Sequence, residues 1–430
     1  MENIMESSSD NTTKQVKQIY LDYAAATPVD ARVLSAMQPY FTEKFYNPSA
    51  SYLPAKHIRE EYEAKKAILA NSIGAKSPDL IITAGATESI NLAFTVLKNT
   101  KTCSFNRLAS TSNTQTDILN SESNSLHCLI LETEHAAVRE SAKNLSNGNF
   151  DEIKVDQYGL IDLSDLKAKI RDNTVLVSVA LANNELGTIQ PLSEISRILQ
   201  EVKKQRLAVK NLTPIYLHSD ASQAMNLIDL SVARLGVDLL TINAAKIYGP
   251  KGVGALYAAR GIKLSPITFG GGQEMGLRSG TENVPGLVGF SVASELTKKH
   301  LVSSRKNYQI YAKTFREIVE QKSLIAPRWL GHPKHQLANF IPVCFKGLDA
   351  ERLIFKLEDR GIYVSTGAAC AASKGQKSHV LFAIGLSDEE IAGSLRITLG
   401  KDITLEDIKM AAETVAEVVN LEAKRLKLVD

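Results

Sequence analysis

The hydrophobic residues of segment 79–259 form short runs rich in Val, Ile and Leu, separated by longer amphipathic stretches. Buried strands that alternate with helices are the pattern of a parallel sheet with crossover helices. We therefore expect an α/β domain here. An open sheet binds ligands at the carboxyl ends of its strands, so the residues that follow each run are the first candidates for a site. The predicted strands are residues 80–83, 128–131, 175–181, 215–218, 239–242 and 253–257.

The hydrophobic pattern changes after about residue 298. A charged helix, a strand-like segment at 339–345 and another helix follow, which is the pattern of a second, α+β domain. The closing segment 404–426 begins with Thr404 and Asp407 in capping positions, and its apolar residues share one helical face. This segment predicts a helix that packs on the second domain.

Length and composition limit the class of protein. At 430 residues the chain exceeds the roughly 250–300 residues at which one core stops growing, so two domains are expected. The 44% of hydrophobic residues is typical of a soluble globular protein. A net charge of +3 without long runs of like charge, and the lack of a ~20-residue apolar run, give no reason to expect nucleic acid or a membrane as partner. The four scattered cysteines favour reduced thiols in a cytoplasm over a disulfide scaffold.

The strongest local signal is the segment AAKIYGPKGVGALY, in which Lys246 follows an apolar run and precedes a glycine-rich loop. Its amine could form a Schiff base with an aldehyde, or it could be a structural or phosphate-binding lysine. Asp220 ends the predicted strand of HSDASQ, and neighbouring strands would bring it close to Lys246. A carboxylate keeps a cofactor's pyridine nitrogen protonated and makes the ring an electron sink. A lone Asp at a strand end can also be a helix N-cap.

Two segments could bind an anion. In ITAGATESINLA a strand leads through a glycine turn into a helix that starts near Ala86 and Thr87. Free backbone amides at the positive end of that helix could bind a phosphate, although a plain capping turn has the same sequence pattern. In RSGTEN, Arg278 and Thr281 could meet an anion or merely order a loop.

Other strand ends carry polar side chains. His135 follows a strand in LETEHAAV and opens a helix, where an imidazole could stack on a flat ring and move protons. Most single histidines are structural, so His135 matters through its neighbours. Asn183 and Asn184 in LANNELG could bind a ring hydroxyl or a substrate carboxylate.

The C-terminal part supplies a thiol and a guanidinium group. Cys370 lies in a segment rich in Gly, Ala and Ser, whereas Cys128 and Cys344 lie within predicted strands. An exposed thiol on a loop suits a nucleophile, and an incidental loop cysteine is the alternative. Arg396 could offer a bidentate fork to an amino-acid carboxylate or form a surface ion pair.

Taken together, these motifs resemble the cysteine desulfurases of the NifS/IscS type in the class V aminotransferase superfamily. The match runs in family order from about Ile19 to Gly400. Order and spacing make it more specific than any single motif. The matching segments are YLDYAAATP, TAGATESINLA, TEHAAV, NNELGTIQP, HSDASQ, KIYGPKGVGALY, GGGQEMGLRSGTENVPG, STGAACAAS and SLRITLG.

The resemblance implies a dimeric fold-type I enzyme that depends on pyridoxal 5'-phosphate (PLP). Its α/β fold would comprise a large domain, with a mostly parallel sheet flanked by helices, and a smaller α+β domain. Residues 99–126, rich in Ser, Thr and Asn, are expected to be a surface insertion. The expected division is a disordered tail at 1–17, a segment of the small domain at 18–29, the large PLP-binding domain at 30–298 and the small domain at 299–430.

The resemblance also implies a role for each matching residue. The cofactor would be bound by Lys246 (the Schiff-base lysine), Asp220 (ring nitrogen), Gln223 and Asn184 (ring hydroxyl and substrate), Ala86 and Thr87 (phosphate), Asn243 (phosphate) and Thr281 (the neighbouring subunit's phosphate). His135 would be the stacking acid/base, Arg396 the carboxylate clamp and Cys370 the sulfur acceptor.

The reaction implied by the resemblance converts L-cysteine to L-alanine, and the sulfur passes to Cys370 as a persulfide. A sulfur-acceptor protein would then receive it, for iron-sulfur clusters, thio-cofactors or tRNA. Electron withdrawal into the ring weakens the carbon-sulfur bond, which agrees with this chemistry. The alternatives are a selenocysteine lyase or another class V lyase, and a degenerate, non-catalytic interaction partner.

Some positions depart from the family's pattern. Asn243 and Ala245 stand where the family usually has a Ser or Thr and a His that bind the phosphate. The methyl group of Ala245 cannot replace an imidazole, so we expect a loss of ~1.5–3 kcal/mol of cofactor affinity. Met275 replaces an arginine that is common in the family's glycine-rich segment.

Overall fold

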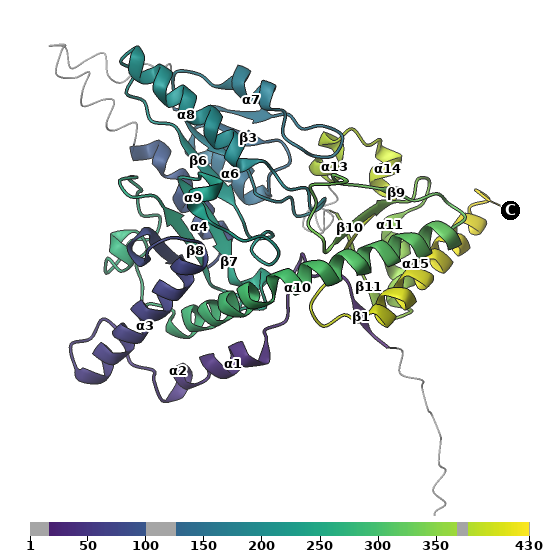
Figure 1. Ribbon diagram of the computed structural model, residues 1–430, viewed down its shortest axis with the longest axis horizontal. Helices are drawn as coiled ribbons and strands as arrows, with labels where there is room; N and C mark the ends of the chain where they lie inside the picture. The colour runs from purple at the N-terminus through teal and green to yellow at the C-terminus, as the bar shows by residue number, and fades with distance from the viewer. Residues whose placement is uncertain (1–16, 100–125, 368–376, 430) are drawn as a thin grey trace, which may run out of the picture.

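The computed structural model describes residues 17–99, 126–367 and 377–429. Cys370 lies outside the described residues, as do the predicted tail up to residue 16 and the predicted insertion from 100 to 125. Figure 1 shows a large sheet flanked by helices in one part of the molecule and smaller sheets with helix α15 (Leu405–Arg425) in the other. The long helix α10 (Val284–Lys322) runs along both parts.

The large sheet has seven strands in the order β2-β8-β7-β6-β5-β3-β4. Its strands are β2 (Leu80–Thr83), β3 (His127–Leu131), β4 (Phe150–Ile153), β5 (Thr174–Ser178), β6 (Tyr216–Asp220), β7 (Leu239–Asn243) and β8 (Gly254–Ala258). All six predicted strands are present, with ends shifted by at most three residues. The pairs from β7 through β4 are parallel, so the prediction of a mostly parallel sheet is confirmed.

Strand β8 departs from the predicted parallel arrangement, because it is antiparallel to both β7 and β2. The link from β7 to β8 consists only of residues 244–253. A parallel pair needs a crossover of roughly a dozen residues or more, whereas a short link returns the chain antiparallel. Lys246 lies in this short link, so the pairing of β7 with β8 fixes both ends of the segment that carries the lysine.

The larger part of the molecule also contains helices. They are α1 (Ala31–Met37), α2 (Pro39–Thr42), α3 (Leu53–Ser72), α4 (Ala86–Phe94), α6 (Ala136–Leu145), α7 (Leu163–Lys169), α8 (Leu192–Ala208) and α9 (Val232–Leu235). Helix α4 packs on α6 and on strands β7 and β8, and α10 packs on α1 and α3. The strands that end near the predicted site are therefore buried between layers of helices.

The smaller part combines the C-terminal residues with the start of the chain. Its four-stranded antiparallel sheet has the order β12-β13-β10-β9, and β1 pairs in parallel with β11. The elements are β1 (Ile19–Tyr20), β9 (Arg328–Trp329), β10 (Phe340–Cys344), β11 (Ile362–Tyr363), β12 (Ser365–Thr366), β13 (Ser394–Thr398), α11 (Ala350–Glu358), α13 (His379–Ala383) and α14 (Asp388–Ala392). Because α10 is continuous, the domain boundary proposed at 298/299 lies inside a helix rather than in a linker.

Helix α15 forms with the predicted cap. Thr404 Oγ1 accepts a hydrogen bond from the Asp407 backbone N–H at 3.2 Å, and the Asp407 carboxylate accepts from the Thr404 N–H at 3.0 Å. Two free donors of the helix start are thereby satisfied. The helix packs on α10 and α11, as its apolar face predicts. None of the described helices combines the length and apolar character that a membrane crossing requires.

Candidate active site

Lys246 lies in a short 3₁₀ helix (Ala244–Lys246) directly after β7. The Asn243 side chain caps this helix by accepting from the Ala245 N–H at 3.2 Å. The Lys246 ammonium group donates to the backbone carbonyls of Ala24 at 2.7 Å and Ala25 at 2.6 Å, in the segment that follows β1. Residues 24 and 25 therefore lie directly beside the lysine amine.

Gln223 meets the same segment. Its Nε2 donates to the Ala24 carbonyl at 3.0 Å, so the structure brings Gln223 and Lys246 to one shared acceptor. Asp220 ends β6, which is the neighbour of β7 in the sheet. One Asp220 carboxylate oxygen, Oδ1, accepts from the Ser222 N–H at 2.9 Å. The N-cap alternative for Asp220 is wrong, because no helix begins at this residue.

A second carboxyl group, which the sequence analysis missed, lies beside Asp220. Glu134 is completely buried at the end of β3, and its Oε1 accepts from the Ala180 N–H at 2.5 Å. Its Oε2 has no hydrogen-bond partner among the described residues. Burial raises the pKa of Glu134 to about 8, and the nearby Asp220 carboxylate raises it further. Glu134 is therefore held largely protonated at neutral pH.

His135 is the N-cap of α6, and its ring is exposed. Its Nδ1 accepts a hydrogen bond from the Ala137 N–H at 3.1 Å. A nitrogen that accepts carries no proton, so the neutral ring has its proton on Nε2. The capping bond therefore fixes the tautomer of His135, and Nε2 is the ring nitrogen that can donate a proton.

The predicted phosphate cradle is the start of α4. Gly85, the N-cap, has φ 152°, and a β-carbon there would point into open space. Gly254 packs so closely that a β-carbon on it would lie 2.7 Å from the Gly85 backbone. The exposed Thr87 and the neighbouring Ala86 stand in the first turn, where free amides favour an anion. The open space and the bare backbone leave room for a phosphate.

Arg278 and Thr281 lie on the loop before α10. Arg278 Nε pairs with Glu88 Oε1 at 3.1 Å, and Glu88 Oε2 accepts from the Ala84 N–H at 2.6 Å. Arg278 thus orders the turn that leads into α4, which was one of its two predicted roles. The Thr281 side chain is exposed and stands apart from the Lys246 contacts. Within one chain, then, Thr281 is not part of this cluster.

The preceding segment GGGQEMG is fixed by a buried ion pair. Glu274 accepts from Lys66 Nζ at 2.7 Å, from the Tyr62 hydroxyl at 2.5 Å and from the Ile82 N–H at 3.0 Å. Both Glu274 and Met275 have positive φ, 47° and 61°, which costs free energy for residues with a β-carbon. The three contacts to Glu274 offset that cost and hold the Met275 side chain outward, where it is exposed.

Arg396 lies on β13 and is only 4% exposed. Its Nη2 pairs with Asp22 Oδ1 at 2.7 Å, and its Nη1 donates to the Asn184 carbonyl at 3.1 Å. Its Nε is buried and has no partner among the described residues. The alternative of a surface ion pair is wrong, because the guanidinium is enclosed. Asp22 was missed by the sequence analysis. It pairs with Arg396 and lies only two residues before Ala24, whose carbonyl accepts from Lys246.

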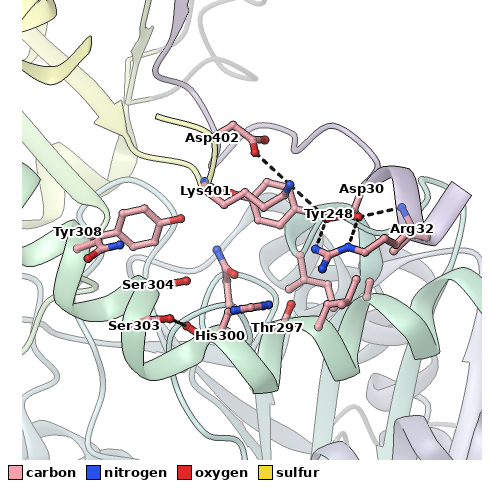
Figure 2. Close-up of a pocket in the computed structure, with 16 residues that line it drawn as sticks. Asp30, Arg32, Tyr248, Thr297, His300, Ser303, Ser304, Tyr308, Lys401 and Asp402 are labelled. Atoms are coloured by element: carbon pink, nitrogen blue, oxygen red, sulfur yellow. Dashed lines mark hydrogen bonds and ion pairs between the residues drawn. The ribbon is translucent and has the colours of Figure 1, made fainter. Parts of the chain in front are cut away.

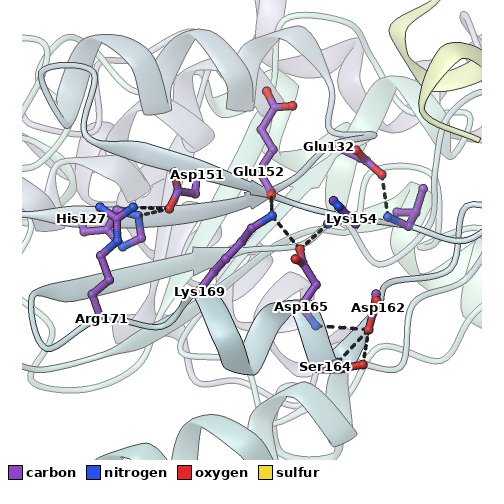
Figure 3. A network of polar contacts seen from close by, with 11 residues as sticks. His127, Glu132, Asp151, Glu152, Lys154, Asp162, Ser164, Asp165, Lys169 and Arg171 are labelled. Carbon is purple, nitrogen blue, oxygen red and sulfur yellow. Dashed lines mark hydrogen bonds and ion pairs between the residues drawn. The ribbon is translucent and has the colours of Figure 1, made fainter.

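Two other features lie away from this cluster. A cavity of about 360 Å³ lies between α1, α10 and Lys401. Figure 2 shows side chains that line it; Tyr248 is one of them, but none of the described site residues that were predicted is. Figure 3 shows an ion network around the buried His127, which pairs with Asp151 at 3.4 Å. Burial and the charge of Arg171 lower the pKa of His127 to about 4. His127 begins β3, whereas the predicted site lies beyond the strand's other end.

Comparison with known proteins identifies the family. The class-V aminotransferase model matches residues 19–410. The chain belongs to this family. The chain is 39% identical to cysteine desulfurase IscS 1 of Archaeoglobus fulgidus, over 93% of this chain and 96% of the relative. It is 37% identical to cysteine desulfurase IscS of Methanosarcina thermophila, over 95% and 94% of the two chains.

Solved structures of class-V aminotransferase relatives have the same fold. A NifS-like protein superposes with a TM-score of 0.80 and 30% identity, covering 94% of this chain and all of the other. SspA in complex with cysteine superposes with a TM-score of 0.71 and 31% identity, covering 89% of this chain and 99% of the other. The expectation of a NifS-like fold is confirmed.

The class-V aminotransferase family implies PLP, and the donor set of this chain fits that group. The Lys246 amine and the Gln223 amide share the Ala24 carbonyl as acceptor. Asp220 ends β6, the strand that pairs with β7 just before Lys246. The open start of α4 leaves room for a phosphate. The Nδ2 of Asn243 donates to none of the described residues, so it is available to a phosphate despite the capping role of Oδ1.

Proposed function

We propose that this chain is a PLP-dependent cysteine desulfurase. The observation that carries the proposal is the arrangement of two cations on one short segment: Lys246 contacts Ala24 and Ala25, and Arg396 pairs with Asp22. An α-amino acid carries an amine and a carboxylate on the same carbon. An aldehyde held by Lys246 would react with the amine, and the nearby Arg396 guanidinium would bind the carboxylate. The relatives named cysteine desulfurase and the cysteine complex of SspA support L-cysteine as that amino acid.

Each residue near Lys246 has a proposed part in holding the cofactor. Lys246 Nζ would hold the aldehyde, and the Asp220 carboxyl group at the end of β6 would lie beside the ring nitrogen. Gln223 and Asn184 would bind the ring hydroxyl and the substrate. The phosphate would lie at the start of α4, with Ala86, Thr87 and Asn243. Bound there, PLP supplies an aldehyde and an electron-withdrawing ring.

The proposed reaction uses groups of the protein for its proton and sulfur transfers. Lys246 Nζ carries the proton taken from the substrate α-carbon, and His135 gives or takes a proton at Nε2. The Cys370 thiolate attacks the sulfur of the substrate, the bond between sulfur and the β-carbon breaks, and that carbon gains a proton. L-cysteine and one enzyme thiol thereby become L-alanine and one enzyme persulfide.

Product analysis tests this function directly. With L-cysteine and a thiol reductant, we expect L-alanine and sulfide to form in equal amounts. L-selenocysteine and cysteine sulfinate, assayed in parallel, distinguish a desulfurase from a selenocysteine lyase or another class V lyase. A protein that binds PLP but forms no alanine from any of the three amino acids would instead be a non-catalytic partner.

Substitution of Arg396 by Met is expected to raise the KM for L-cysteine about a hundredfold, with a smaller effect on kcat. The reason is the loss of charge-assisted hydrogen bonding to the carboxylate, and a net loss of about 2.7 kcal/mol corresponds to a hundredfold change. Steady-state kinetics measures the change. Arg352→Met is the matched control, because Arg352 pairs with the buried Glu422 in the smaller part. An unchanged KM in Arg396→Met would contradict the carboxylate role.

A homodimer is the proposed assembly. Exposed aromatic and aliphatic side chains gather around α2 and the start of α3: Phe41, Phe45, Tyr52 and Leu53 are each more than half exposed. Phe45 also stacks on Tyr46 at 4.6 Å. Apolar groups concentrated on a surface mark protein contacts. Sedimentation velocity should show twice the chain mass, and a monomer at micromolar concentration would contradict the dimer. A sulfur-acceptor protein, which would take the persulfide sulfur from Cys370, is the other proposed partner.

A further inference from the structure

Glu185 is a buried carboxyl group with no part in the reaction proposed above. It lies in the NNELG segment directly after Asn184, and it is 5% exposed. Its backbone N–H donates to Asn183 Oδ1 at 2.8 Å, which fixes the turn that carries it. The Arg396 guanidinium is the nearby positive charge that acts on it. A buried carboxyl without a direct ionic partner is costly, so its hydrogen-bond partners matter.

One oxygen of Glu185 meets two segments that are distant from each other in sequence. Glu185 Oε2 accepts from the Ser378 hydroxyl at 2.6 Å, and Ser378 is 3% exposed. A β-carbon on Gly367 would lie 2.6 Å from the same oxygen. No side chain fits at Gly367 unless that carboxyl moves. Residues 367 and 378 flank the segment that carries Cys370, one on each side. Glu185 therefore lies where the two ends of that segment come together.

Neighbouring contacts hold the second of these ends. Ser378 is also the N-cap of α13, because its Oγ accepts from the Leu381 N–H at 3.1 Å. His379 Nε2 hydrogen-bonds to the Glu134 carbonyl at 2.9 Å. Two consecutive residues of the smaller part are thus bound by buried glutamates of the larger part, one through its side chain and one through its backbone.

We propose that Glu185 is a positioning residue: it binds Ser378 at one end of the Cys370 segment, leaves no room for a side chain on Gly367 at the other end, and so sets the place of both ends relative to Arg396. This inference rests on the proposed function. Arg396 donates to the carbonyl of Asn184, so the guanidinium that would bind the substrate carboxylate contacts the residue directly before Glu185. Displacing Glu185 would disturb both described ends of that segment without removing any group that binds cofactor or substrate.

Reversal of one hydrogen bond tests the proposal. Ser378→Asp keeps an N-cap acceptor for Leu381 but replaces the hydroxyl donor with a second carboxylate against Glu185. We expect amide hydrogen exchange in α13 to become about tenfold faster and kcat to fall about tenfold, with KM and the visible PLP band unchanged. Adding Glu185→Gln should restore both, because the glutamine amide can donate to the new carboxylate. Glu185→Gln alone should be mild, since its side-chain oxygen still accepts from Ser378.

Ser387→Asp is the matched control, because Ser387 is the N-cap of α14 but is exposed to solvent, and its partner Glu390 is only partly buried. It should leave kcat and the exchange of α13 unchanged. The proposal would be overturned if Ser378→Asp had the α13 exchange rate and the kcat of the wild-type protein. It would also be overturned if the double variant recovered neither quantity relative to Ser378→Asp. Faster exchange with an unchanged kcat would also overturn it, since the contact would then be structural only. If the wild-type protein forms no alanine, the proposed function fails, while the loss and recovery of α13 protection still report on the Glu185 contact.

Discussion

Replacing Lys246 with alanine is expected to give a folded protein that lacks the visible absorbance of lysine-bound PLP and does not turn over L-cysteine. The amine is the proposed holder of the aldehyde and the proposed carrier of the α-proton, and the proton-transfer role alone is worth roughly 10²–10⁴-fold in rate. In the structure the amine donates to the carbonyls of Ala24 and Ala25. Loss of those bonds frees two carbonyls without leaving a buried charge, so the fold should survive.

The control for this variant is Lys251→Ala. Lys251 lies in the same glycine-rich loop, five residues after Lys246, but its side chain is exposed. It should keep both the visible band and the turnover of L-cysteine. Spectra recorded before and after addition of L-cysteine, together with thermal unfolding, separate loss of the cofactor from loss of the fold. A Lys246→Ala protein that still shows the band and still forms alanine would refute the assignment of this lysine.

The fold was largely predictable where a local pattern determines the element. The strands of the large sheet are short apolar runs with no competing helical period, and the last helix carries its own cap in Thr404 and Asp407. The direction of β8 was not predicted, because it depends on the length of the link from β7 rather than on the strand's own residues. The continuity of α10 was missed for a related reason: the change in hydrophobic pattern near residue 298 marks a change of packing partners, from α3 to α15, within one helix.

Candidate site residues were found where the functional group ends a strand or opens a helix. Lys246 and Gln223 fit this description, and the structure brings them to one carbonyl. Asp22, Glu134 and Glu185 were missed, although each lies within or beside a quoted motif. Their importance comes from partners more than forty residues away, such as Arg396 for Asp22 and Ser378 for Glu185. A carboxylate has no local sequence feature that reveals which distant group it will meet.

The two cysteines that the structure describes are poor candidates for the sulfur acceptor. Cys128 and Cys344 are both completely buried in strands. Burial raises the pKa of the Cys128 thiol to about 12 and also raises the pKa of Cys344. Because the thiolate is the nucleophile, neither residue is ionised or accessible at neutral pH. The remaining cysteines, Cys103 and Cys370, lie outside the described residues, and only Cys370 lies in a segment that both Glu185 contacts flank.

Replacing Cys370 with serine is therefore expected to abolish sulfide release from L-cysteine in the presence of a reductant, while the visible PLP band and its response to L-cysteine remain. A serine hydroxyl keeps the size of the side chain but cannot form a persulfide, so the defect should be confined to sulfur transfer. Cys103→Ser is the matched control and should keep full activity. Mass spectrometry of the wild-type protein after incubation with L-cysteine should find the added sulfur on the peptide with Cys370. Undiminished turnover in Cys370→Ser, or sulfur recovered on the Cys103 peptide instead, would show that another thiol accepts the sulfur. Either result would contradict the role of Cys370 but leave the role of Lys246 in cofactor binding intact, because the Lys246→Ala variant tests that role separately.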